Sequence, residues 1–277
     1  MLGKLIKYDM KALNRFLIII HCFLLLAAAL LRIFVTGRIY NLESEENGVL
    51  LGLFVILYFI LVVGVSIGTL IIVGVRFYTN LFSSEGYLTR TLPVTSGQHL
   101  LSKTITGCIW GCIDTLLILA ATYYTIFTPA VKGVYSQHRE EILELLGLTG
   151  KYADTPVSVA VLFLLLLLIE DTLSKIITLY ASIVLGQLFS GHRVLGAVVA
   201  YFALNTVISV IAFAVMVPLG YSSNTFLIAA PDTLTLSYNS SGLFVDSLKM
   251  SVIFSLAVTV ILYLASYHLM KKKIDLI

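Results

Sequence analysis

Long, uninterrupted apolar stretches dominate this sequence and restrict it to one class of fold. Six stretches each hold about 20 or more mostly apolar residues, the length that a helix needs to cross a bilayer. None of them alternates polar and apolar residues as a barrel strand would, so we predict helices. The six predicted spans are residues 17–35, 49–75, 104–128, 157–189, 194–219 and 250–270.

The composition agrees with an all-α integral membrane protein. Of the 277 residues, 59% are hydrophobic and 12% are charged, against about 25% charged in soluble domains. Prolines interrupt helices, and all of them lie in the connections or at span ends: Pro93, Pro129, Pro156, Pro218 and Pro231. The three cysteines, Cys22, Cys108 and Cys112, lie in apolar runs. We expect them to pack as small hydrophobic residues and to bind no metal.

The distribution of Lys and Arg predicts the orientation. Eleven Lys or Arg and three Asp or Glu lie on one side of the six-span topology, in residues 1–16, 76–103, 190–193 and 271–277. The other side has six Lys or Arg, with Arg32 included, and nine Asp or Glu. By the positive-inside rule both termini are cytoplasmic.

The first 16 residues have the pattern of an amphipathic interfacial helix, ahead of a membrane domain over residues 17–277. Apolar residues recur at helical spacing, while the basic residues fall on the opposite side: Lys4, Lys7, Lys11 and Arg15. We expect the basic face to contact anionic headgroups at the cytoplasmic leaflet. A simple topology anchor is compatible with the same pattern.

Residues 76–103, "RFYTNLFSSEGYLTRTLPVTSGQHLLSK", form the longest predicted cytoplasmic loop. Its aromatic and aliphatic residues are more numerous than a solvated linker needs, and Ser96 is a candidate helix cap. The loop either docks a partner protein or packs under its own bundle.

Four charged residues are predicted to lie inside spans: Asp114, Glu170, Asp171 and Lys175. Such groups must face protein or water. Asp171 and Lys175 are one helical turn apart and can pair, and Asp114 is a second candidate partner for Lys175. The cluster is either a structural ion-pair network or a part of a substrate pathway.

Two short motifs are set aside. "LLGLTGKY" lacks the first glycine and the hydroxyl of a Walker A loop, since Leu145 and Tyr152 stand there. "GVSIG" lies inside an apolar helix, where Gly64 and Gly68 are predicted to serve close helix packing. The chain therefore has no ATP site of this type.

The loop motif over residues 76–103, behind a basic amphipathic start, resembles permease subunits of ABC-2 type ATP-binding cassette transporters of Gram-positive bacteria. In that family this stretch is the coupling helix, which sits in a groove of the ATPase. The resemblance implies ATPase contacts at Phe82, Ser83, Glu85, Gly86 and Tyr87.

The same resemblance implies a multi-pass protein of the bacterial cell membrane that is not itself an enzyme. Its partners would be two cytoplasmic ATPase chains, which bind ATP and Mg, and a second permease of the same or a related sequence. The implied function is export of a peptide or another amphipathic substrate, or its extraction from the membrane. Besides membrane lipid, no other partner is expected, and nucleic acid is not one.

Three features leave alternatives open. The apolar patch at residues 226–230 in the last outer connection resembles a short re-entrant helix, or is a surface loop with one buried corner. A gradient-driven secondary transporter would use Asp114, Glu170 and Asp171 as proton or ion sites. A membrane partner of a sensor or enzyme, without transport, is a third class.

Overall fold

The fold is built from helices alone over the described part of the chain. A computed structural model describes residues 2–38, 45–83, 85, 86, 89, 91, 93–140, 154–189, 191–218 and 243–272, and none of these lies in a strand. The helices are α1 (Leu2–Arg38), α2 (Glu45–Phe82), α4 (Ser96–Ile126), α5 (Pro129–Gln137), α7 (Val157–Gly186), α8 (Arg193–Met216) and α9 (Leu243–Lys272). The prediction of an all-α fold is confirmed.

Five of these helices are long and apolar enough to cross a membrane: α1, α2, α4, α8 and α9. The chain therefore has the character of a multi-pass membrane protein. α7 has 30 residues and is equally apolar at its start. It differs because Glu170, Asp171 and Lys175 lie together near its middle. That α7 is a sixth span remains a prediction.

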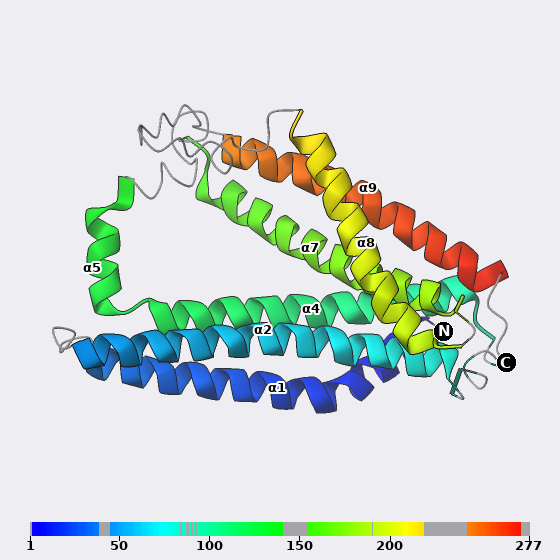
Figure 1. Cartoon of the computed structure of the whole chain (residues 1–277), viewed down its shortest axis with the longest axis horizontal. Helices are drawn as coiled ribbons and strands as arrows, with labels where there is room; N and C mark the ends of the chain where they lie inside the picture. The colour runs from blue at the N-terminus through cyan, green and yellow to red at the C-terminus, as the bar shows by residue number, and fades with distance from the viewer. Residues whose placement is uncertain are drawn as a thin grey trace.

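The long helices form two groups (Figure 1). α1, α2 and α4 pack along one another, and α7 packs against α8 and α9. The two groups meet where α7 contacts α4 and α2. Figure 1 shows α4 and α7 close together at one end of the bundle and diverging toward the end where α5 lies.

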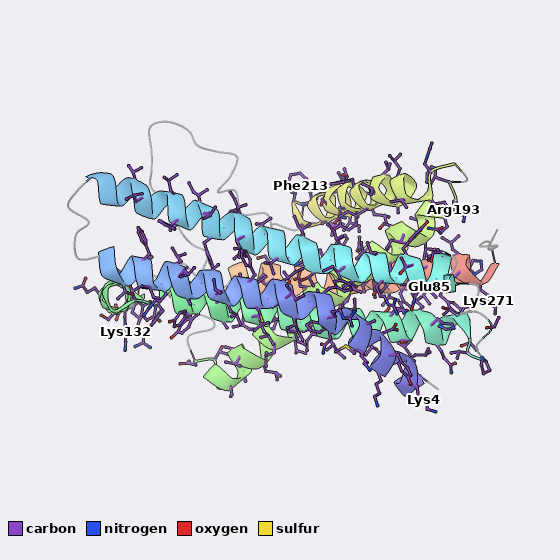
Figure 2. All side chains as sticks on the ribbon, turned by 90° about the horizontal axis from the view of Figure 1, so that it is seen from below. Lys4, Glu85, Lys132, Arg193, Phe213 and Lys271 are labelled. Atoms are coloured by element: carbon purple, nitrogen blue, oxygen red, sulfur yellow. The ribbon has the colours of Figure 1, made fainter. Side chains whose placement is uncertain are left out.

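Successive long helices run in opposite directions, so the start of α1 and the end of α9 lie at the same end of the bundle (Figure 1). Figure 2 shows Lys4, Glu85, Arg193 and Lys271 at this end and Lys132 at the opposite one. We call the first the loop end and the second the far end.

Helix boundaries differ from the prediction near the loop end. The predicted interfacial helix over residues 1–16 is continuous with the first span, as α1 is a single helix of 37 residues. Figure 2 shows that its first turns, toward Lys4, bend away from the rest of α1. α2 continues to Phe82 and α4 starts at Ser96. The first and last parts of the predicted loop over residues 76–103 are therefore helical, at residues 76–82 and 96–103.

The helix cap predicted at Ser96 is wrong by one residue. Thr95 is the cap of α4, because its hydroxyl accepts from the Gln98 backbone N–H at 3.3 Å. The Gln98 side-chain oxygen in turn accepts from the Thr95 N–H at 3.3 Å. This reciprocal pair is a capping box, which satisfies two backbone donors that would otherwise have no partner.

Close packing between the two helix groups depends on glycines other than the predicted pair. A Cβ at Gly64 would meet nothing within 4 Å, and one at Gly68 would only touch Ile20 at 3.7 Å. A Cβ at Gly107 of α4 would instead lie 2.9 Å from the Tyr180 hydroxyl of α7. Gly111, four residues later, faces Thr172 of α7 with equally little room. The small-xxx-small pattern that joins helices is therefore Gly107 and Gly111.

Gly186, at the end of α7, sets the separation of α7 and α8. A Cβ there would lie 2.5 Å from the backbone nitrogen of Ala197 in α8, and a backbone atom cannot move aside as a side chain can. Gly186→Ala should therefore lower the free energy of unfolding by about 1–3 kcal/mol, the usual cost of overpacking. Thermal unfolding in detergent measures this, with Gly64→Ala as the matched control that should leave the melting temperature unchanged or raised. Equal melting temperatures for the two variants would contradict the close contact.

Candidate functional site

The connection between α2 and α4 starts with a tight turn. The Gly86 N–H donates to the Ser83 carbonyl at 2.8 Å, and the Thr89 hydroxyl donates to the Glu85 carbonyl at 3.0 Å. A Cβ at Gly86 would lie 2.6 Å from the Leu81 carbonyl oxygen, so only glycine fits here. A bulkier residue at Gly86 would distort the turn itself. Tyr87, another predicted contact residue, lies outside the described residues.

Phe82 does not lie at the surface of this turn. Its side chain is 4% exposed and packs edge-on against Phe77 with 5.8 Å between ring centroids. Phe77 in turn stacks on Tyr180 of α7 at 3.9 Å. Phe82 thus anchors the turn to the core, while Glu85 projects from it with 57% of its side chain exposed.

A chain of polar contacts runs inward from Glu85 across three helices. Glu85 Oε2 lies 3.7 Å from Arg76 Nη1 and accepts from Asn80 Nδ2 at 3.0 Å. The side-chain amide oxygen of Asn80, Oδ1, accepts from Lys103 Nζ, which also pairs with the Asp9 carboxylate. We call Glu85, Asn80, Lys103 and Asp9 the polar chain. It joins the turn to α2, to α4 and to the first turns of α1.

The inner part of the polar chain is deeply buried. Lys103 and Asp9 are each 5% exposed, and Asp9 Oδ2 also accepts from the Ser102 hydroxyl at 3.2 Å. α7 reaches the same point, because the Tyr180 hydroxyl donates to the Lys103 carbonyl at 3.1 Å. The ammonium group of Lys103 has two oxygen partners, as a buried charge requires.

Asp9 and Asn80 are not among the residues predicted from the sequence. A signal for Asp9 exists, since it falls on the apolar side of the predicted amphipathic helix, one turn before Leu13. An acidic residue on a buried face needs a cation, and Lys103 is the only Lys or Arg in the first two turns of α4.

The predicted basic residues of the first segment, Lys4, Lys7, Lys11 and Arg15, are all exposed. On the other side of α1, Leu13 is buried in the core and Met10 packs against it. The start of α1 therefore has one face against its own bundle and a basic face directed outward.

Asp114 is paired, but with His21 and not with Lys175. His21 Nε2 lies 2.8 Å from Asp114 Oδ1, which also accepts from the Thr69 hydroxyl at 3.0 Å. His21 Nδ1 carries a hydrogen, because it lies 2.7 Å from the Leu17 carbonyl, which can only accept. One further proton must lie in the short contact between His21 and Asp114. The pair then has no net charge, which suits its buried position.

Asp171 and Lys175 of α7 pair with each other at 2.6 Å. Their side chains are 51% and 56% exposed on the surface of the chain. Glu170 is partly buried, and its Oε1 makes no hydrogen bond to a described residue. α7 is also joined to α9 through the Ser255 and Ser174 hydroxyls at 3.1 Å. The four predicted intramembrane charges thus belong to two separate places, Asp114 to the α1–α2–α4 group and the other three to α7.

No group of three or more His, Cys, Asp or Glu side chains within the described residues is arranged to hold a metal ion. Comparisons with protein-family models, with curated proteins and with solved structures found no match to this chain. The arguments about function therefore depend on the geometry and the sequence.

Removal of one partner from the buried pair tests its importance. Lys103→Met strands the Asp9 carboxylate and should cost about 3–5 kcal/mol of stability. Asp9→Asn in addition should restore part of that loss, since no uncompensated charge remains. Lys4→Met is the matched control: it removes an exposed Lys charge of α1, and such surface changes usually stay within about 0.5 kcal/mol. Chemical or thermal unfolding of the purified chain measures all three, and a Lys103→Met melting temperature equal to that of the control would contradict the buried pair.

Proposed function

We propose that this chain is the transmembrane permease subunit of an ATP-binding cassette exporter. It would cross a bacterial cell membrane six times with both termini in the cytoplasm. Separate ATPase chains, which hold ATP and Mg, would drive it, and a second permease would complete the pathway. The substrate would be a peptide or another amphipathic molecule.

The polar chain is the observation that carries the proposal. A coupling element must be exposed at one point and firmly connected to several spans, so that a push on it moves them together. Glu85 is exposed at the turn and is connected through Asn80 and Lys103 to Asp9. The polar chain thereby connects α1, α2 and α4 close to the proposed ATPase contact at Glu85. A loop without a mechanical role needs no such connection.

The placement of charges at the two ends supports the proposed orientation. Lys4, Arg193 and Lys271 lie at the loop end with Glu85 (Figure 2). A cytoplasmic loop end follows from the excess of Lys and Arg there. The connection between α2 and α4 is then on the side where ATP is available.

The exposed ion pair of Asp171 and Lys175 on α7 is an argument for a second permease or for a water-filled pathway beside this chain. An α7 that crosses the membrane carries Asp171 and Lys175 at a depth where lipid tails solvate charges poorly. Their exposure on this chain means that its own helices do not cover them. A second permease or a water-filled pathway between two permeases would do so.

Crosslinking tests the ATPase contact. In a background with Cys22, Cys108 and Cys112 replaced by Ala, Ser83→Cys should crosslink to a chain that has a Walker A sequence and no membrane spans. In the purified complex the yield should change when ATP is added, because the ATPases close around it. Ser136→Cys is the matched control, since Ser136 is exposed on α5 and its hydroxyl also bonds a backbone carbonyl of its own helix. The proposal would be contradicted if Ser83→Cys formed crosslinks only within the permease in every nucleotide state.

The buried pair of His21 and Asp114 favours a second candidate, a proton-driven secondary transporter. This pair holds a proton between two titratable groups inside the bundle. Such a transporter would move protons across proteoliposomes when substrate is added without ATP, and Asp114→Asn should abolish that signal. Asp154→Asn, an exposed change in the connection before α7, is the control. A pH-sensitive dye measures the movement, and its absence in wild-type vesicles without ATP would exclude this candidate.

A further inference from the structure

A cavity at the loop end shares no lining residue with the polar chain. It has a volume of about 690 Å³ and is lined by Tyr78 of α2, by the residues that lead into α8, and by the first turns of α8: Gly191, His192, Arg193, Val194, Leu195 and Val198. The cavity is open to the surface, because the side chains of Val194, Leu195 and Val198 are 60%, 66% and 51% exposed.

The lining of the cavity is divided by polarity along the direction of α8. His192 and Arg193, where α8 begins, are the charged or titratable lining residues, and Tyr78 of α2 adds a phenol. Val194, Leu195 and Val198 form the wall that leads toward the middle of the helix. From Arg193 to Val198 the wall is about 8 Å long, at 1.5 Å per residue. The cavity therefore suits a ligand with a charged end and an apolar end.

Arg193 is available for an anion. No ion pair or hydrogen bond joins its guanidinium to another residue of the described ranges, in contrast to Arg76 and Lys103. No acidic side chain lines the cavity. A guanidinium binds phosphate oxygens with two parallel N–H donors, so a phosphate ester is the anion that this end fits best.

The apolar wall continues beyond the cavity onto an open face of α8. Leu195 and Phe202 are each 66% exposed, and α8 packs mainly against α7. Arg193 is at the same end of the bundle as Lys4 and Lys271 (Figure 2), where the headgroup layer of a membrane would lie. An acyl chain that starts in this layer would run along α8 without leaving the hydrocarbon.

We propose that this cavity binds an anionic phospholipid from the leaflet at the loop end. Its phosphate contacts Arg193 and His192, and its first acyl carbons contact Leu195 and Val198. The site needs only that α8 lies in a membrane, so it does not depend on the transporter proposal. Soluble phosphate compounds share the headgroup chemistry but lack the apolar end.

Native mass spectrometry of the purified full chain in neutral detergent tests the site. Phosphatidylglycerol should remain bound where phosphatidylcholine with the same chains is lost. Arg193→Gln should lower phosphatidylglycerol occupancy about fivefold, the equivalent of about 1 kcal/mol for one basic residue at an anionic surface. Lys271→Gln, which removes the same charge at the same end outside the cavity, should change it less than twofold. Both variants should keep the wild-type melting temperature, because neither side chain is paired with a described residue.

A second pair of variants tests the apolar wall. Val198→Trp fills the cavity and should displace phosphatidylglycerol, whereas Val199→Trp adds the same ring to the next residue of α8, outside the lining. Equal occupancy in wild type and Arg193→Gln, or equal loss with the two Trp variants, would overturn the site. Displacement by glycerol phosphate at concentrations equal to the lipid would also overturn it, because the anion would then come from solution.

Discussion

The packing of the helices at the loop end depends on the hydrogen bonds that the buried ammonium group of Lys103 donates. A buried cation is stable only with oxygen partners on most sides, and here they come from α1 and α2 while the lysine itself is in α4. The requirement fixes how the first turns of α1 bend, because Asp9 has to reach α4. It also places Asn80, and through Asn80 the exposed turn, at a set distance from the core. Tyr180 adds α7 to the same point.

The two helix groups are held together closely at the loop end, and their relative position is less constrained at the far end. The close contacts between the two helix groups, at Gly107 and Tyr180 and at Gly111 and Thr172, belong to the half of α4 nearer the loop end. Toward the far end α4 and α7 diverge (Figure 1). A change of angle at the loop end would therefore appear as a larger displacement at the far end. The proposed transporter would use this geometry, because its ATPases would act at the loop end while the substrate pathway opens at the far end.

The sequence predicts the helices well because membrane thickness and apolar length are a strong signal. It fails at the ends of helices, where apolar length gives no information: α2 extends to Phe82 because Phe77 and Phe82 pack in the core, and α4 begins with a capping box at Thr95 and Gln98. Pairing is harder still, since Asp114 has several candidate partners at similar depth. Only the packing of α1 against α4 selects His21 over Lys175. The turn at Gly86 is visible in the sequence, but the burial of Phe82 beneath it is not.

Three of the ion pairs among the described residues differ in when they can form as the chain is made. Asp9 with Lys103 and His21 with Asp114 each need α1 and α4, which are separated by all of α2. Asp171 and Lys175 are one turn apart on α7 and neutralise each other as soon as that turn is helical. As the proposed sixth span, α7 would enter the bilayer together with α8 as a hairpin. α1 instead has two polar groups, Asp9 and His21, whose partners are in α4. Biogenesis of the first group of helices is therefore cooperative, and that of the second group is sequential.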